Sequence, residues 1–483
     1  MTDGAPRSCD LIIRGATLYD GSGAPGFVAD LAVAGDRIAA IGALGGTAAA
    51  IEVDGRGRAL APGFIDVHTH DDNALLTDPG MWCKASQGVT TVVTGNCGIS
   101  LAPLVHDHPP PPLDVLAERG GFRFPGFPDY VRALEASPPS VNAALMVGHS
   151  TLRVGAMADL GRAATPAEIA TMRAGVREAL DCGAVGFSTG LFYPTGKAAP
   201  PDEVASLLEE LAGTGAVYTT HMRDEADGVE EALEESFATA RSAGVPLIIS
   251  HHKCMGRRNF GRSPATLARI EAARRKQAVA IDVYPYVAGS TVLLEQLIEQ
   301  SARILVSWSD PHPELAGREL AEIAALWGVG AAEAMRRLQP GGGIYFMMDE
   351  ADVERIMAWP DAMIGSDGLP RDRFPHPRLW GTFPRVLGRY VRERGLLTLA
   401  EAVRRMTGLS AERFGLADRG RLRSGAFADL VLFDPAAIAD RATFEQPQLP
   451  SAGLELVLVN GQPVMRDGRA TGARPGRVLR RAA

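Results

Sequence analysis

The feature that most constrains the fold is an alternation of short apolar runs and helical segments across residues 62–414. The apolar runs are Phe64–Val67, Val89–Val93, Ala143–Val147, Ala184–Ser188, Val217–Thr220, Leu247–Ser250, Ala278–Val283 and Ala362–Ile364. Amphipathic stretches between several of them indicate helices over Pro166–Cys182, Pro201–Gly213, Gly228–Ala243 and Ser263–Lys276. Repeated βα units predict a parallel sheet in an α/β fold, and this length favours a closed (β/α)8 barrel of the TIM type.

An open, doubly wound sheet is the alternative architecture, but no Gly-x-Gly-x-x-Gly follows an early strand to support it. Residues 286–346 interrupt the alternation and are too long for a simple loop, so we expect an insertion there that covers the site. The four consecutive prolines of 109–112 predict an irregular surface loop.

Both ends of the chain have a different, β-rich texture with glycine-containing turns. The strands expected there are Cys9–Arg14, Ala16–Tyr19, Asp30–Ala34, Arg37–Ile41, Glu52–Val53, Asp429–Phe433, Leu454–Val459 and Gln462–Arg466. We predict that residues 1–61 and 415–483 combine into one small β-sandwich or β-barrel domain, and that residues 62–414 form the catalytic barrel.

Composition narrows the partners and the compartment. The net charge is −8 and the basic residues are scattered, which argues against a nucleic-acid partner. The five cysteines form no close pair, as expected in a reducing compartment. No apolar run is long enough to span a bilayer and the N-terminus shows no signal-peptide core, so we expect a cytoplasmic protein that does not bind membranes. The sequence leaves a monomer and a small homo-oligomer open.

Residues that can bind metals follow the predicted strands. These residues are His68 and His70, Cys97, His221, the pair His251-His252, and Asp367. Each has an ordinary explanation alone: a cysteine can be a small buried apolar residue, a histidine a core residue, and an aspartate a helix cap. Because the carboxyl ends of barrel strands meet at one end of the barrel, their joint occurrence there predicts a metal site. Spacing does not decide between His251 and His252, since adjacent strand residues face opposite sides.

This ordered set resembles the amidohydrolase superfamily, and within it the N-acyl-D-amino-acid deacylases, over nearly the whole chain. The motifs include Phe-Ile-Asp-Val-His-Thr-His-Asp-Asp, Gly-Val-Thr-Thr-Val-Val-Thr-Gly-Asn-Cys-Gly, Thr-His-Met-Arg-Asp-Glu, Ser-His-His-Lys-Cys and Gly-Ser-Asp-Gly. The His-x-His motif marks the superfamily. Asn-Cys-Gly is much more specific, because many binuclear relatives carry a carboxylated lysine where Cys97 stands.

The resemblance implies a tight zinc site at Cys97, His221 and His251. It also implies a second, weaker metal position at His68 and His70, with Cys97 able to bridge the two. Zinc would polarise the amide carbonyl and acidify a bound water. Asp367 would act as the general base and then deliver the proton to the leaving nitrogen.

The substrate residues are also assigned by resemblance. The α-carboxylate of an N-acyl-D-amino acid would meet Lys253, Tyr284, Ser290 and Arg378, of which the arginine offers a bidentate fork. An apolar side-chain pocket falls on Phe192, Tyr345 and Met348.

Residues 290–296 contain no arginine and include Glu295, which would repel a second carboxylate if it pointed inward. We therefore expect hydrophobic substrates such as D-methionine, D-leucine or D-phenylalanine derivatives. The alternatives are an N-acyl-D-glutamate or D-aspartate deacylase, a hydantoinase-like cyclic amidase, and a non-catalytic relative. A non-catalytic relative is the weakest alternative, because such relatives usually lose metal-binding residues and this sequence keeps them.

Overall fold

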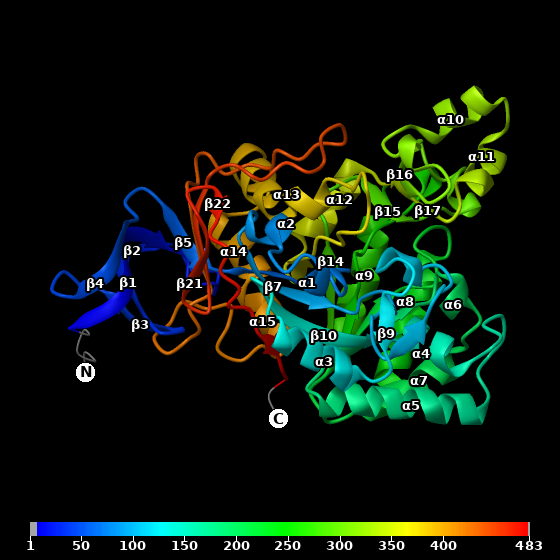
Figure 1. The fold of residues 1–483 in the computed structure, drawn as a ribbon, viewed down its shortest axis with the longest axis horizontal. Coiled ribbons are helices and arrows are strands. Elements are labelled where there is room, and N and C mark those ends of the chain that lie inside the picture. Colours follow the sequence, from blue (N-terminus) through cyan, green and yellow to red (C-terminus); the bar gives the residue numbers. More distant parts are fainter. Residues whose placement is uncertain (1–6, 482–483) are drawn as a thin grey trace.

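The computed structural model describes residues 7–481, and a barrel of eight parallel strands lies at its centre (Figure 1). In barrel order the strands are β6 (Phe64–Asp66), β7 (Val89–Thr94), β10 (Asn142–Gly148), β11 (Gly186–Gly190), β12 (Val217–His221), β13 (Leu247–Ile249), β14 (Val279–Val283) and β18 (Ala362–Ile364). A parallel bridge between Thr69 and Gly368 joins the last strand to the first. The predicted TIM-like barrel is confirmed, and the open doubly wound sheet is wrong.

Alternation along the strands explains why they are apolar on both faces. On β13, Ile248 belongs to the cluster that fills the barrel, whereas Leu247 and Ile249 pack in the larger cluster outside it. On β14, Ala280 likewise faces inward, between outward-facing Val279 and Ile281. Successive side chains of a strand point to opposite faces, so a barrel strand covered by helices carries apolar residues on both faces.

Helices follow the strands and cover the barrel. They are α1 (Ala74–Thr77), α2 (Trp82–Ala85), α3 (Phe127–Ala136), α4 (His149–Ala156), α5 (Pro166–Asp181), α6 (Pro194–Lys197), α7 (Pro201–Leu208), α8 (Val229–Ala243), α9 (Ser263–Arg274), α12 (Glu350–Ala358), α13 (Arg378–Arg385), α14 (Leu399–Met406) and α15 (Gly408–Arg413). A π-helix, Val386–Glu393, continues α13. The start of α5 shows how the sequence sets these bounds: Thr165 accepts a hydrogen bond from the Glu168 amide and Pro166 occupies the first turn.

Strands from both ends of the chain form one mixed sheet at one end of the molecule (Figure 1). Its members are β1 (Ser8–Leu18), β2 (Phe27–Ala34), β3 (Arg37–Gly42), β4 (Ala48–Asp54), β5 (Ala59–Pro62), β19 (Leu430–Phe433), β20 (Leu454–Val459), β21 (Gln462–Arg466) and β22 (Arg469–Ala470). The antiparallel pair β5–β19 joins the two halves, as the sequence predicted.

One strand prediction in this sheet is wrong. Cys9–Arg14 and Ala16–Tyr19 are not two strands but one, β1, whose register against β2 shifts between Ile13 and Ala16. Gly15 lies in the shift at a φ of 62°. Glycine adopts positive φ without steric cost, so the irregularity bends the strand without ending it.

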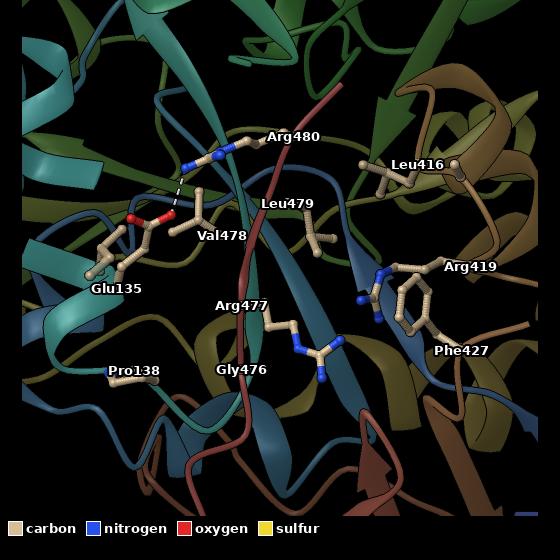
Figure 2. A pocket seen from close by; sticks show the side chains of 12 residues that line it. Glu135, Pro138, Leu416, Arg419, Phe427, Gly476, Arg477, Val478, Leu479 and Arg480 are labelled. Atoms are coloured by element: carbon tan, nitrogen blue, oxygen red, sulfur yellow. Dashed lines mark hydrogen bonds and ion pairs between the residues drawn. The ribbon is translucent and has the colours of Figure 1, made fainter. Parts of the chain in front are cut away.

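The C-terminal segment returns to the barrel. Strand β23 (Val478–Leu479) pairs with the first residues of β10, at the end of the barrel opposite the carboxyl ends of its strands. A cavity of about 540 Å³ lies beside this segment. Figure 2 shows side chains that line it, among them Arg480, which forms an ion pair of 2.6 Å with Glu135 of α3. The cavity's other arginines, Arg419 and Arg477, are also paired with carboxylates.

A separate substructure occupies most of residues 288–346. Strands β15 (Ala288–Val292), β17 (Gly341–Phe346) and β16 (Arg303–Ser309) form a three-stranded antiparallel sheet. Helices α10 (Leu320–Trp327) and α11 (Ala331–Leu338) extend beyond it at the end of the molecule far from the terminal sheet (Figure 1). The proline run lies between the two strands of a hairpin, β8 (Leu104–His106) and β9 (Phe122–Phe124). Within residues 7–481, no helix is both long and apolar enough to cross a membrane.

Candidate metal centre and active site

The carboxyl ends of the barrel strands bring the predicted metal-binding residues together. His68 and His70 follow β6, Cys97 follows β7, and His221 ends β12. His251 follows β13 and Asp367 follows β18. All six side chains are buried.

Their donor atoms form two clusters that share one thiol. Cys97, His221 and His251 make the first cluster, and in each cluster the donor atoms lie within 4.8 Å of one another. The second cluster contains His68, His70, Cys97 and Asp367. The arrangement offers two adjacent metal positions with Cys97 between them.

The spacing of these atoms fits zinc. Cys97 Sγ lies 3.3 Å from His68 Nε2 and 3.4 Å from His251 Nε2. Tetrahedral Zn²⁺ holds sulfur and nitrogen at about 2.0–2.3 Å, which puts two ligands about 3.3–3.8 Å apart. Neither ring nitrogen of His221 has a hydrogen-bond partner in the described chain, although Glu225 Oε2 lies 3.4 Å from Nε2.

The electrostatics of Cys97 favour the thiolate that binds metals. Burial alone would raise the pKa of this thiol. The imidazoles of His68 and His251 outweigh burial and hold the pKa of Cys97 well below its usual value.

The two adjacent histidines point in different directions. His251 contacts Cys97, whereas His252 Nε2 lies 2.9 Å from Thr266 Oγ1 on α9. Burial lowers the pKa of His252 to about 4, so this ring is neutral at pH 7. The geometry therefore makes His251 the residue that could hold a metal, in agreement with the choice that the family resemblance made.

Three of the site residues have strained backbone. Cys97, His251 and Asp367 adopt φ values of 54°, 35° and 51°, in the left-handed region that non-glycine residues rarely enter. Each such residue costs on the order of 1–3 kcal/mol unless its surroundings hold it. Hydrogen bonds do so here: the His251 amide donates to Asp282 Oδ1 at 2.8 Å, and the Asp367 amide donates to the His68 carbonyl at 2.8 Å.

Two buried carboxylates behind the histidines were not assigned from the sequence. Asp282 Oδ2 lies 3.3 Å from His68 Nδ1. Glu225 Oε1 lies 3.1 Å from His251 Nδ1. Burial would raise the pKa of Glu225, but Lys253 and His221 lower it below its usual value. A carboxylate in such a position orients a histidine ligand, and for His68 it also fixes the tautomer. His251 Nδ1 lies between Glu225 and the Lys253 ammonium, whose Nζ is 2.7 Å away.

Asp367 lies between the second cluster and a buried arginine. Its Oδ1 is 3.2 Å from His70 Nε2, and its Oδ2 is 3.0 Å from Arg378 Nη2. Burial would raise the pKa of Asp367, but Arg378 and His68 hold it well below the usual value. The group is therefore ionised and can accept a proton.

Arg378 is fully buried, with the guanidinium carbon 4.6 Å from the centre of the Tyr284 ring. Its Nε and Nη1 have no hydrogen-bond partner among residues 7–481. Lys253 Nζ also lies near this ring, 5.8 Å from its centre. Lys253 Nζ is already within 2.8 Å of Glu225, so its charge is neutralised more fully than the sequence led us to expect. The unpaired N–H groups of Arg378 are the clearer receptor for an anion.

The three predicted apolar pocket residues lie in one cluster beside this group. Tyr345 and Met348 belong to the same buried cluster, and Phe192 packs against it while its ring stacks 5.3 Å from His221. Tyr345 also donates a hydrogen bond to the Val292 carbonyl, which fixes its ring within residues 288–346. Glu295 is 43% exposed and forms an ion pair with Arg336.

A buried ion cluster closes the barrel beneath the metal-binding residues. Lys84 of α2 is completely buried, with Nζ 2.9 Å from Asp66 and 3.2 Å from Asp71. Its Nζ also donates to Ser366 Oγ at 2.9 Å, and the Ser366 amide donates to Asp66 Oδ1 at 2.8 Å. These contacts join the ends of β6 and β18. His68 and His70 follow β6, and Asp367 follows β18.

The chain matches the amidohydrolase family over residues 52–465. It is 56% identical to a D-aminoacylase of Alcaligenes xylosoxydans xylosoxydans over 483 residues, which cover all of both chains. Two solved D-aminoacylase structures, 56% and 55% identical, superpose with TM-scores of 0.96 and cover 98% of this chain and 100% of theirs. In the second, the binuclear metal centre shows activation by one metal and attenuation by the other.

An N-acyl-D-glutamate deacylase of Bordetella bronchiseptica is 50% identical, with a TM-score of 0.94 and coverage of 98% of this chain and 100% of that one. Its structure holds zinc and a phosphonate mimic of the tetrahedral intermediate. Both the family match and the full-length identity agree with the geometry above. The chain belongs to the amidohydrolase family, and within it to the group that includes the D-aminoacylases.

Proposed function

We propose that the protein hydrolyses N-acyl-D-amino acids to a carboxylate and the free D-amino acid, with zinc as its cofactor. One observation carries the proposal: at one end of the barrel, two donor clusters that share Cys97 lie near the buried Arg378, whose Nε and Nη1 have no partner in the described chain. The clusters can hold metal ions, and the arginine can hold a substrate carboxylate. The similarity to D-aminoacylases supports the same reaction.

Cys97, His221 and His251 would hold the tighter zinc ion, because a thiolate and two imidazoles match its ligand preference. His68 and His70 would hold a second, weaker one together with Cys97. A bound zinc ion supplies Lewis-acid polarisation of the amide carbonyl and makes a bound water more acidic.

Asp367 performs the proton transfers. As an ionised carboxylate it accepts a proton from the attacking water and then delivers it to the amide nitrogen. An amide nitrogen leaves readily only when protonated, so one carboxylate serves both half-reactions. Arg378 contacts both Asp367 and the proposed carboxylate site, and it thereby aligns the substrate with the general base.

The α-carboxylate of the substrate binds Arg378, with Tyr284, Ser290 and Lys253 around it. Charge-assisted hydrogen bonds from a guanidinium are strong and directional, which suits an anion that must be held in one orientation. The need for a free carboxylate favours a linear amide over the cyclic substrate of a hydantoinase.

The substrate side chain is hydrophobic, as in D-methionine, D-leucine or D-phenylalanine. Phe192, Tyr345 and Met348 supply an apolar surface next to the carboxylate site. Glu295 faces solvent and neither repels nor attracts a substrate there. An N-acyl-D-glutamate or D-aspartate deacylase is the second candidate, because a deacylase of that specificity is 50% identical.

A substrate panel tests this assignment. We expect the zinc-loaded enzyme to hydrolyse N-acetyl-D-methionine, N-acetyl-D-leucine and N-acetyl-D-phenylalanine with kcat/KM at least tenfold above N-acetyl-D-glutamate, since burial of one apolar side chain is worth about 1.5–3 kcal/mol. Faster hydrolysis of N-acetyl-D-glutamate would support the second candidate. Turnover of hydantoin without turnover of any linear amide would exclude both.

A further inference from the structure

A buried carboxyl group that the mechanism does not use lies beside the proposed carboxylate site. Asp372, in the segment between β18 and α13, is 3% exposed. Its Oδ2 is 3.4 Å from the hydroxyl of Ser290 on β15. Its Oδ1 has no hydrogen-bond partner in the part of the chain that the structure describes.

Two arginines and two serines face this carboxyl. Neither arginine forms an ion pair with it in the described chain. Arg371, on the same segment, contacts Asp310, and Arg378 of α13 contacts Asp367. Ser290 of β15 and Ser307 of β16 are the neutral groups. Burial raises the pKa of Asp372 to about 7 against the opposing effects of Ser307, Arg378, Arg371 and Ser290.

The Ser290 hydroxyl has one proton and competing acceptors. Besides Asp372, the Gly343 carbonyl lies 3.3 Å from Ser290 Oγ. If Asp372 is ionised, the charged carboxylate is the stronger acceptor and holds the hydroxyl proton. If Asp372 is protonated, its own O–H donates to Ser290 Oγ, and the Ser290 proton is free to donate to an incoming anion.

We propose that Asp372 is a positioning residue that acts through Ser290. When Asp372 is protonated, its O–H donates to Ser290 Oγ and turns the serine hydroxyl toward the substrate α-carboxylate, so that substrate binds to this form of the enzyme. This inference rests on the proposed function, because it assumes that an α-carboxylate binds between Arg378 and Ser290. Ionised Asp372 opposes binding in two ways: it withdraws the Ser290 proton, and it places a negative charge near the substrate anion. Substrate binding and protonation of Asp372 are therefore coupled.

The coupling predicts a pH-dependent KM. The fraction of ionised Asp372 increases as pH rises through about 7. We expect the KM for N-acetyl-D-methionine to increase about tenfold between pH 6 and pH 8.5, because a lost hydrogen bond to a charged group weakens binding by about that factor or more. Asp372 does not touch the reacting atoms, so kcat should not follow the same titration.

The test is the pH profile of KM and kcat for the zinc-loaded enzyme and two variants. In Asp372→Asn the side chain is neutral at every pH, so KM should stay near the low-pH value of the wild type. In Ser290→Ala the proton relay is absent, so KM should be raised at pH 6. It should then rise less between pH 6 and pH 8.5 than in the wild type, because only the charge of Asp372 still opposes binding. Asp114→Asn is the matched control: Asp114 is another carboxyl whose pKa burial raises, to about 6, but its neighbours are Arg371 and Asp310, and its profile should follow the wild type.

A flat KM profile of the wild-type enzyme would overturn the inference without any variant, and so would a profile of Asp372→Asn that rises like the wild type. Either result leaves the proposed function standing, because both require measurable hydrolysis. Absence of hydrolysis in the wild type at every pH would instead refute the proposed function.

Discussion

Replacing Lys84 by methionine should destabilise the protein strongly, because the lysine is the shared counter-ion of two buried carboxylates. Asp66, Asp71 and Lys84 are all completely buried, with ion-pair distances of 2.9 and 3.2 Å. Methionine fills a similar volume and leaves both carboxylates without a cation. Removal of one partner from a buried ion pair costs about 3–5 kcal/mol.

That cost corresponds to a measurable change in the melting temperature. An unfolding entropy of about 2.1 cal/mol/K per residue gives about 1 kcal/mol/K for 483 residues that unfold together. The Tm should therefore fall by about 3–5 °C at pH 7. The surface variant Lys276→Met, at an exposed position, is the control and should lie within about 1 °C of wild type.

The loss should also depend on pH. Burial already raises the pKa of Asp71 even with Lys84 present. When the pKa of a carboxyl group in the folded protein is above its unfolded value of about 4, the free energy of unfolding of the protein decreases as pH rises from 4 toward the folded pKa. The Tm difference between Lys84→Met and wild type should thus be larger at pH 8 than at pH 5.

Differential scanning fluorimetry of the zinc-loaded proteins at the two pH values measures both effects. A Tm of Lys84→Met equal to that of Lys276→Met, or a Tm deficit that shrinks as pH rises, would show this prediction to be wrong. The first result would mean that the ion cluster does not stabilise the barrel closure. The second would mean that the buried carboxylates are not what the lysine stabilises.

Three further substitutions test the site. Asp367→Asn should lower kcat by at least about 10³ while zinc content, measured by metal analysis, stays near wild type, and full activity would remove Asp367 from the proton transfers. Cys97→Ala should weaken both metal positions, so chelator competition should show at least a hundredfold loss of zinc affinity, whereas unchanged affinity would mean that the shared thiolate is not a ligand. Glu225→Gln should lower zinc affinity by about 10–100-fold through the orientation of His251, and an effect on KM alone would place Glu225 with the substrate instead.

The barrel and the positions of its metal-binding residues could be predicted because both depend on local pattern. Each strand is a short apolar run, and topology brings the carboxyl ends together whatever the details of packing. Cys97, His221 and Asp367 therefore meet although 270 residues separate the first from the last, as the predicted barrel requires. The choice between His251 and His252 is an exception: spacing alone left it open, and the family resemblance decided it.

The groups that support the site could not be predicted in the same way. Lys84 lies in a four-residue helix, where a lysine is normally solvated, yet its side chain is completely buried against Asp66, Asp71 and Ser366. Glu225 and Asp372 lie outside the helices and strands, where acidic residues usually face water. Their burial depends on contacts between segments distant in sequence. The motif Thr-His-Met-Arg-Asp-Glu was the one signal that could have drawn attention to Glu225.

Under the proposed function, zinc at the shared-cysteine site drives stereospecific amide hydrolysis. The most direct measurement compares N-acetyl-D-methionine with N-acetyl-L-methionine before chelation, after chelation, and during stepwise return of zinc. We expect turnover of the D form alone, loss of that turnover with chelator, and recovery as about one zinc per chain is restored. Bound zinc without turnover of either form, or equal turnover of both, would contradict the proposed function.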